Sequence, residues 1–389
     1  ISGGISNSGT LNIGEKDGTV SKENPIITGN NYGVVNNSGT FNFYDGTIKG
    51  KTGAINGAVT EIEEGYEIIK ETIDSYEVKY LDKLPIAKLV NKNKEYTDLQ
   101  EAINDAETGE TIEILRDATF ISSTETVGVP ENKNITIDIK GYILTRGDST
   151  LLNNKGTLEI KDSGKGEENS KTYGKIENTS GIAISNSGNL KINNIIINAE
   201  NNDVIVNNDS GKIEIINSSI STSSFSKNVI KNNDVGEIII SSGTIKSTGG
   251  NSAHVITNSG TGKIVVNGGN IILSRYGYEE EAIINASSGT IEVNGGTIES
   301  SNFGNKGIEN KGSGKIIIND GEISAYYDGI YNLSTGEVEI NGGTIKSINN
   351  SGLLTMKSGT ITSGISNSQS GQATITGGTI SGGISNSGT

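Results

Sequence analysis

Residues 282–300 read Ala-Ile-Ile-Asn-Ala-Ser-Ser-Gly-Thr-Ile-Glu-Val-Asn-Gly-Gly-Thr-Ile-Glu-Ser. In short strands, side chains alternate between opposite faces. The set predicted to face inward is apolar: Ile283, Ile291, Val293 and Ile298. The set predicted to face solvent is polar: Glu292, Asn294 and Glu299. Gly295 and Gly296 stand where the chain turns a corner, and we expect positive φ there.

The same unit recurs along the chain as x-I-x-N, a Ser/Gly turn, an alternating I-x-I/V run and Gly-Gly-Thr-Ile. Each x-I-x-N motif ends in an asparagine: Asn186, Asn207, Asn232, Asn258, Asn285, Asn310, Asn332, Asn350, Asn367 and Asn386. Successive asparagines are 21, 25, 26, 27, 25, 22, 18, 17 and 19 residues apart. Repeats of this length built from short strands are coils of a β-solenoid, and the scarcity of leucine and of helix-forming segments disfavours leucine-rich repeats. The sequence therefore predicts an all-β parallel β-helix in which branched Ile and Val side chains stack between coils.

The asparagine column has a structural and a functional interpretation. Asparagine tolerates left-handed backbone at turns, and its amide can bond to the asparagine of the next coil to form a ladder. A glycan or metal site is the alternative. Position and repetition explain the column fully, so we expect the ladder and predict no catalytic, cofactor or metal site in it.

Composition limits the classes of partner. The formal net charge is −15 and the pI is about 4.7, which argues against nucleic acid and anionic membranes and favours solubility and cation binding. There are no cysteines, which excludes disulfides and thiolate chemistry. The segment has no run of eighteen apolar residues, so we expect no membrane insertion in it.

Residues 1–10 and 380–389 are identical, Ile-Ser-Gly-Gly-Ile-Ser-Asn-Ser-Gly-Thr, at an offset of 380 − 1 = 379. We expect the chain to be a window from a longer tandem array, with copies of itself as partners in tandem or in a filament. The missing initiator methionine and signal peptide are then expected to reflect where the window was cut.

Regular coils are interrupted between about residues 59 and 149. Residues 61–81 alternate in a β-like pattern, and residues 82–93 predict a connector. A short helix is predicted near 97–106, with Thr97 as N-cap, Gln100 completing a capping box and Gly109 ending it. Strands are predicted at 111–115 and 135–144. The helix is expected to cover the end of the solenoid.

Three stretches carry a resemblance to a known family: Tyr-Thr-Asp-Leu-Gln-Glu-Ala-Ile at 96–103, Lys-Asn-Ile-Thr-Ile-Asp-Ile-Lys-Gly-Tyr at 133–142, and Gly-Thr-Leu-Glu-Ile-Lys-Asp-Ser at 156–163. With Gly-Glu-Thr-Ile at 109–112, they resemble the opening of pectin-lyase-like β-helix modules of large surface proteins of low-GC Gram-positive bacteria. Residues 64–73 are similar to the closing segment of such modules. The resemblance covers about 59–163 and implies right-handed coiling, secretion and an extracellular, cell-surface location. It carries no catalytic motif onto this chain.

The predicted organisation has five parts. Residues 1–58 are the final coils of a preceding module, 59–81 a closing β segment, and 82–93 a connector. Residues 94–149 form an N-terminal cap with the first strands, and 150–389 form regular coils. About 13 coils at about 4.8 Å each predict a rod about 60 Å long.

Three classes of function remain open. The first is a structural rod or stalk of a giant tandem-repeat extracellular fibre or adhesin, which the period favours. The second is a module that binds a protein or a host or cell-wall glycan through aromatic side chains on the variable turns. Those rings are Phe225, Tyr276, Tyr278, Phe303, Tyr326 and Tyr327, with His254 on an intervening turn.

The third class, a polysaccharide lyase or hydrolase, is the least favoured. Its cationic base or carboxylate pair has no match here, because Arg116, Arg146 and Arg275 are far apart. His254 is expected to be a turn residue, and Glu279, Glu280 and Glu281 are expected to form a solvated loop. No pair of coils shows acidic residues at matching offsets.

Overall fold

The computed structural model describes residues 1–120, 126–164, 173–249, 254–274, 280–333, 335–368 and 370–389. The chain divides into two compact units, Ile1–Pro85 (unit 1) and Ile86–Thr389 (unit 2). The division falls within the predicted connector. Each unit is described below by itself.

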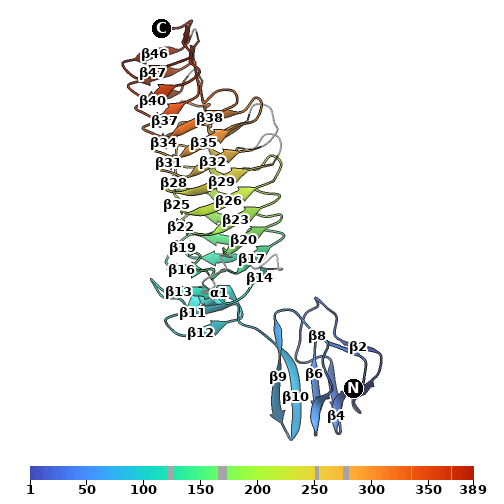
Figure 1. Cartoon of the computed structure of the whole chain (residues 1–389). Helices are drawn as coiled ribbons and strands as arrows, with labels where there is room; N and C mark the ends of the chain where they lie inside the picture. Colours follow the sequence, from blue (N-terminus) through green and yellow to red (C-terminus); the bar gives the residue numbers. More distant parts are fainter. Residues whose placement is uncertain (121–125, 165–172, 250–253, 275–279, 334, 369) are drawn as a thin grey trace. The chain divides into compact units, whose positions relative to one another are not determined.

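Unit 2 is a parallel β-solenoid of about 13 turns, as the sequence predicts. In the described residues each regular coil adds one strand to each of three sheets (Figure 1). In spatial order the first sheet holds β12 (Lys94–Tyr96), β11 (Ala87–Leu89), β13 (Thr111–Ile114), β16 (Asn134–Asp138), β19 (Thr157–Lys161), β22 (Asn189–Asn193), β25 (Lys212–Ile216), β28 (Glu237–Ile240), β31 (Lys263–Val266), β34 (Thr290–Val293), β37 (Lys315–Ile318), β40 (Glu337–Ile340), β43 (Leu353–Met356) and β46 (Gln372–Ile375).

The second sheet holds β14 (Ala118–Phe120), β17 (Ile143–Arg146), β20 (Lys175–Asn178), β23 (Ile196–Ala199), β26 (Ser218–Thr222), β29 (Gly243–Ser247), β32 (Asn270–Leu273), β35 (Thr297–Ser300), β38 (Glu322–Ala325), β41 (Thr344–Ile345), β44 (Thr360–Ile361) and β47 (Thr379–Ile380). The third sheet holds β15 (Val127–Val129), β18 (Leu152–Asn154), β21 (Ile184–Asn186), β24 (Ile205–Asn207), β27 (Ile230–Asn232), β30 (Ile256–Asn258), β33 (Glu281–Asn285), β36 (Lys306–Asn310), β39 (Ile330–Asn332), β42 (Ile348–Asn350), β45 (Ile365–Asn367) and β48 (Ile384–Asn386).

The core of unit 2 is a stack of branched apolar side chains in register. Ile291 pairs with Ile264 of the preceding coil and Ile316 of the next, and all three are fully buried. Each buried Ile contributes about 1.5–3 kcal/mol relative to exposure. The four inward residues predicted in coil 282–300 are buried, and the three outward ones are partly exposed. Both halves of the alternation prediction are confirmed.

The Gly-Gly corner needs its two glycines for different reasons. Gly296 has φ of +83°, as predicted, and a Cβ there would meet the Gly269 carbonyl oxygen at 2.6 Å. Gly295 does not have positive φ, contrary to the prediction. It is confined by packing instead, because a Cβ would meet the Asn267 carbonyl oxygen at 2.8 Å.

The cap at the start of unit 2 is built by α1 (Leu99–Asp105), which buries Leu99, Ala102 and Ile103. The predicted N-cap Thr97 is wrong: Asp98 is the N-cap, and its carboxylate accepts from the backbone N–H groups of Gln100 and Glu101. An ionised carboxylate is a stronger acceptor for these groups than a hydroxyl. The C-cap is Ala106, three residues before the predicted end at Gly109.

The predicted capping box is also wrong, because the Gln100 side chain is used elsewhere. Its amide donates to the Gly128 carbonyl at 2.9 Å and accepts from the Gly128 N–H at 2.6 Å. This pair of bonds joins α1 to β15. Gln100 thus fixes the helix against the first strand of the third sheet.

Two predicted segments need correction. Part of the connector 82–93 is strand, since β11 pairs antiparallel with β13 and covers the edge of the first sheet. The strand predicted at 135–144 is two strands, β16 and β17. The turn between them contains Lys140 and Gly141 with φ of +55° and +76°.

Unit 1 also contains parallel coils. Its described strands form three sheets: β1 (Ile5–Asn7), β4 (Tyr32–Asn36) and β7 (Gly53–Asn56); β2 (Thr10–Ile13), β5 (Thr40–Phe43) and β8 (Glu61–Ile62); and β3 (Ile26–Gly29), β6 (Thr47–Gly50), β10 (Tyr76–Lys83) and β9 (Tyr66–Ile73). The hairpin of β9 and β10 pairs antiparallel with β6. The hairpin lies within the residues 59–81 predicted as a closing β segment, except that β10 continues to Lys83.

Candidate functional site

The predicted asparagine ladder is present along the third sheet. Each Nδ2 donates to the Oδ1 of the asparagine in the next coil, over distances of 2.7–3.1 Å. The ladder begins one coil earlier than predicted, at Asn154, and runs to Asn386. Asn258 illustrates its chemistry: Nδ2 donates to the Gly262 carbonyl at 2.9 Å and to Asn285 Oδ1 at 3.0 Å. These buried amides are used within the ladder, which supports its structural interpretation.

A second asparagine ladder lies on the outside of the solenoid. Asn294 donates to Asn267 at 2.9 Å, Asn319 donates to Asn294 at 2.7 Å, and Asn341 donates to Asn319 at 2.9 Å. All these bonds are solvent-exposed. The outer ladder provides an exposed counterpart to the buried one.

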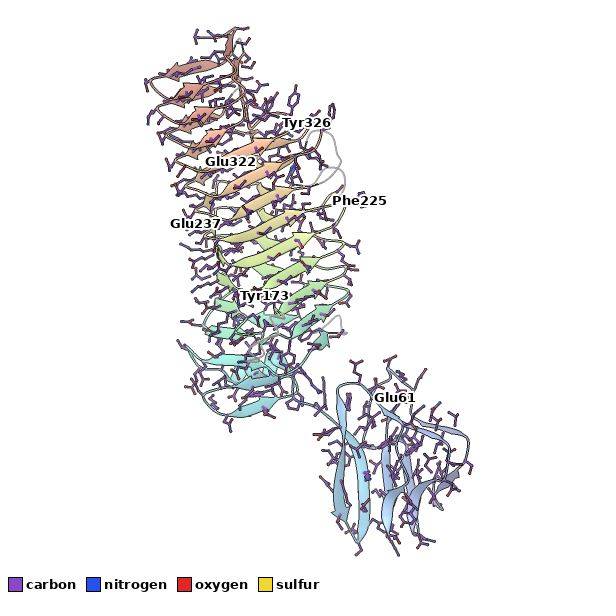
Figure 2. All side chains as sticks on the ribbon, in the orientation of Figure 1. Glu61, Tyr173, Phe225, Glu237, Glu322 and Tyr326 are labelled. Carbon is purple, nitrogen blue, oxygen red and sulfur yellow. The ribbon has the colours of Figure 1, made fainter. Side chains whose placement is uncertain are left out.

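The predicted aromatic residues are on exposed turns. Phe225, Phe303, Tyr326 and Tyr327 are 75%, 61%, 49% and 59% exposed. Figure 2 places Phe225 and Tyr326 on the same side of unit 2, with Glu237 on the other side. Among the described residues, the rings of Phe303 and Tyr326 are brought together, with centroids 5.2 Å apart. Tyr276 and Tyr278 lie outside the described residues.

A polar column follows the start of the third-sheet strands. It is formed by the residue that precedes the x-I-x-N motif in six successive coils: Asp203, Asn228, His254, Glu281, Lys306 and Asp328. The Asn228 N–H donates to Asp203 Oδ1 at 2.6 Å, and the His254 N–H donates to Asn228 Oδ1 at 3.2 Å. Adjacent coils therefore contact one another through this position.

The centre of the polar column is a buried charged cluster. Glu281 Oε2 lies 3.0 Å from His254 Nδ1, and Glu281 Oε1 lies 3.1 Å from Lys306 Nζ. Lys306 Nζ also lies 3.3 Å from Glu309 Oε1 and 4.5 Å from the centroid of the Tyr331 ring. The solvated-loop prediction is wrong for the described part of that run, because Glu280 and Glu281 are 1% and 2% exposed. Glu279 lies outside the described residues.

The cluster also corrects the prediction about His254. His254 faces a carboxylate and does not serve only as a turn residue. Glu281 and Glu309, from neighbouring coils, share Lys306 although their offsets in the motif differ. The signal that would have found Glu281 and Lys306 is the alignment of residues preceding the motif.

Burial and neighbouring charges shift the pKa values of Glu281 and Glu309 in opposite directions. Burial alone would raise the pKa of Glu281, but His254 and Lys306 outweigh it and lower that pKa. Burial, together with the charge of Glu281, raises the pKa of Glu309 despite Lys306. Burial acts against the charge of Lys306, yet the two glutamates raise its pKa. The same cation therefore accompanies one carboxyl group whose pKa is lowered and one whose pKa is raised.

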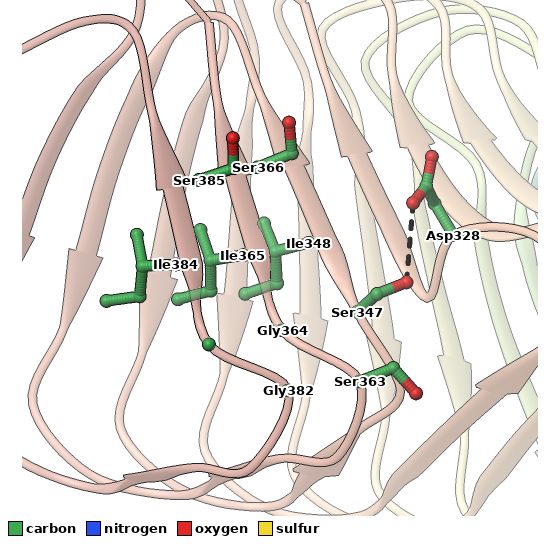
Figure 3. Close-up of a pocket in the computed structure, with 11 residues that line it drawn as sticks. Asp328, Ser347, Ile348, Ser363, Gly364, Ile365, Ser366, Gly382, Ile384 and Ser385 are labelled. Atoms are coloured by element: carbon green, nitrogen blue, oxygen red, sulfur yellow. Dashed lines mark hydrogen bonds between the residues drawn. The ribbon is translucent and has the colours of Figure 1, made fainter.

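A groove of about 470 Å³ lies beside Asp328, the C-terminal member of the polar column (Figure 3). Its walls include Asp328, Ser347, Ser363, Ser366 and Ser385. The Ser347 hydroxyl donates to Asp328 Oδ1 at 3.3 Å. Burial raises the pKa of Asp328 against the opposing hydrogen bonds from Ser347 and Asn349.

Turn length explains where the groove forms. Four residues separate β38 from β39, whereas two separate β41 from β42. The longer turn carries the exposed rings of Tyr326 and Tyr327. Lys346 Nζ donates to the Tyr326 carbonyl, and the Ser347 hydroxyl donates to the Tyr327 carbonyl at 3.3 Å, which fixes this turn beside the groove. Exposed rings and hydroxyl groups thus occur together.

The described residues contain no group of three or more His, Cys, Asp and Glu side chains arranged to hold a metal ion. None of the helical segments described is long and apolar enough to cross a membrane. Comparisons of the chain with protein-family models, with curated proteins and with solved structures found no match.

Proposed function

We propose that this chain is a structural module of a tandem-repeat extracellular fibre or cell-surface stalk. The observation that carries the proposal is the buried asparagine ladder, which joins Asn154 to Asn386 coil by coil beside a continuous apolar core. Every coil is bonded to the next through backbone, amide and apolar contacts. Such a stack becomes longer with each coil while each coil needs contacts only with its neighbours, which suits a part that provides reach.

The surface of unit 2 is consistent with this role. Ion pairs link lysines and glutamates of neighbouring coils on the outer face of the first sheet, including Lys212 with Glu237 at 2.9 Å and Lys263 with Glu292 at 2.7 Å. The net charge of −15 favours solubility of long arrays. The family resemblance supports a secreted, cell-surface location and copies of the chain as partners.

Copy number tests the structural role. In the producing cell, arrays with one, two or three copies would carry an epitope at the end distal to the cell. The epitope's distance from the surface, measured by immunogold electron microscopy, is expected to rise with each copy. An array of the same lengths in which Asn258 and Asn285 of every copy are replaced by Leu provides a control with a weakened ladder. Unchanged epitope distance across the intact arrays would refute the role.

Glycan binding is the second candidate, favoured by the exposed rings beside the hydroxyl-lined groove. Aromatic faces stack on sugar rings, and serine hydroxyls bond to sugar hydroxyls. A double variant with Tyr326→Ala and Tyr327→Ala is expected to lose binding on a glycan array, whereas Phe225→Ala, on a distant turn, retains it. Equal glycan binding by the unaltered chain, the double variant and Phe225→Ala would remove this candidate. Release of unsaturated or reducing ends from polyuronides on the same panel would instead assign the groove to cleavage.

A further inference from the structure

The ten residues that occur twice in the sequence occupy equivalent positions in two coils. In unit 1, residues 1–10 contain β1, which ends at Asn7. In unit 2, residues 380–389 contain β48, which ends at Asn386. Asn7 and Asn386 both belong to asparagine ladders, since Asn7 donates to Asn36 at 2.8 Å and Asn367 donates to Asn386 at 2.7 Å. The same decapeptide thus has the same role in both units.

Unit 1 shows which coil packs on this decapeptide. Ile5 pairs with Val34 and Asn7 with Asn36 in one sheet. Thr10 pairs with Thr40 in a second sheet, and Ser2 bridges to Thr28 in the third. All these pairings are parallel, as between the coils of unit 2. Because both copies form a strand that ends at a ladder asparagine, β1 in unit 1 and β48 in unit 2, the strand face that receives the next coil is built from the same residues in both units.

Unit 2 ends in the register that this coil requires. The Thr389 N–H donates to the Gly371 carbonyl at 3.0 Å, and the Ala373 N–H donates to the Thr389 carbonyl at 2.7 Å. These bonds place Thr389 opposite Gln372, at the start of a strand beside β46. Thr10, the counterpart of Thr389, is likewise the first residue of β2.

The residues after Thr10 fit the next positions of that strand. Leu11, Asn12 and Ile13 of a second copy would lie opposite Ala373, Thr374 and Ile375. The inward positions would then pair Leu11 with Ala373 and Ile13 with Ile375. Ile375 and Ile384 are 38% and 51% exposed, in contrast to the fully buried isoleucines of earlier coils. The coil would cover both.

We infer that unit 2 is continued by residues 11–85 of a second copy of this sequence, joined to Thr389. That segment would extend all three sheets from β46, β47 and β48, and its β9–β10 hairpin would close the solenoid. The inference rests on the proposed tandem arrangement and specifies its register. A closed module would then consist of Ile86–Thr389 followed by residues 11–85 of the next copy.

Hydrogen exchange on an extended chain tests this register. The full chain, Ile1–Thr389, would be followed directly by a second copy of residues 11–85. Amides of β46, β47 and β48 are expected to exchange about 100-fold more slowly than in the unextended chain, because covered sheet edges open only with larger parts of the structure. The original unit 1 serves as an internal reference.

The matched control carries Ile27→Asp, Val34→Asp and Ile48→Asp in the added copy only. These side chains are 1%, 0% and 0% exposed in unit 1, so charge there prevents the coil from packing. The intact extension alone should slow exchange in β46–β48. No slowing with the intact extension, or equal slowing with both extensions, would overturn the inference.

The result is separable from the test of the structural role. Slower exchange in β46–β48 together with an epitope distance that does not change with copy number would support the register and refute the structural role in a fibre. An epitope distance that rises with copy number without slower exchange would support the structural role and refute the register. The copies would then be separate folded units joined by linkers.

Discussion

Replacing Asn258 by Ala tests whether the buried ladder stabilises the solenoid. The side chain is fully buried and makes three hydrogen bonds: Nδ2 donates at 2.9 Å to the Gly262 carbonyl and at 3.0 Å to Asn285 Oδ1, and Oδ1 accepts at 3.0 Å from Asn232 Nδ2. A net contribution of about 1 kcal/mol for each bond predicts a loss of about 3 kcal/mol. Because the side chain is fully buried, bulk solvent does not reach the lost partners.

Native-state hydrogen exchange is the suitable assay, because a repeat protein of this length does not unfold as a single two-state unit. Amides of β27, β30 and β33 are expected to exchange about 100-fold faster, since about 1.4 kcal/mol corresponds to a factor of ten. The control is Asn294→Ala in the exposed outer ladder. It also removes two inter-coil amide bonds, but water replaces them and the expected loss is below about 0.5 kcal/mol.

Asn258→Asp separates hydrogen bonding from side-chain volume. The carboxylate keeps the acceptor for Asn232 but loses both donated bonds and buries a charge, so its pKa is expected to rise. The native state then holds the proton more tightly than the unfolded chain, and stability falls as the pH rises through the raised pKa. Equal exchange rates for Asn258→Ala and Asn294→Ala, or no pH response in the Asp variant, would refute the reasoning.

Further outcomes are expected from the charged cluster and the cap. Lys306→Met leaves Glu281 and Glu309 without their shared cation and should cost about 3 kcal/mol, read as about 100-fold faster native-state exchange of the β33 and β36 amides; an acceleration below about 5-fold would contradict the buried pairing. The pKa of Glu309 is raised from 4.5, so its contribution to stability declines as the pH rises above that value, and Glu309→Gln should flatten this part of the Tm–pH profile; an unchanged profile would argue against it. Asp98→Ala should weaken α1 by about 1 kcal/mol, measured as faster hydrogen exchange at the backbone N–H of Gln100. An N–H of Gln100 that accelerates no more than amides far from α1 would show that the cap does not stabilise the helix.

The sequence alone was sufficient for the solenoid and its ladder because both depend on periodicity. Alternating Ile and Val at two-residue spacing determines which face is buried, as for Ile291 and Val293. An asparagine at the end of every x-I-x-N motif must stack on its counterparts once the coils are parallel. These properties are local and repeat in every coil, so a coil that departs from the repeat pattern does not change the predicted fold.

The cap details depended on competition between neighbouring groups. Thr97 and Gln100 match a capping box, but Asp98 offers a charged acceptor one residue later and Gly128 offers Gln100 two better-placed backbone partners. Gly128 is distant in sequence and belongs to another element. No pattern within the helix could identify it.

The charged cluster and the groove were decided by tertiary structure alone. Glu281 lies in an acidic run that resembles a solvated loop, yet stacking places it between His254 and Lys306 and buries it. The groove lies where the turns between the second and third sheets shorten, from four residues after β38 to two after β41, a difference between coils and not a property of any single coil. The features that every coil repeats, namely the alternation of apolar residues and the ladder asparagine, can be predicted from the sequence. The contacts that differ from coil to coil depend on stacking, because burial and charge pairing are set by the residues of the two neighbouring coils.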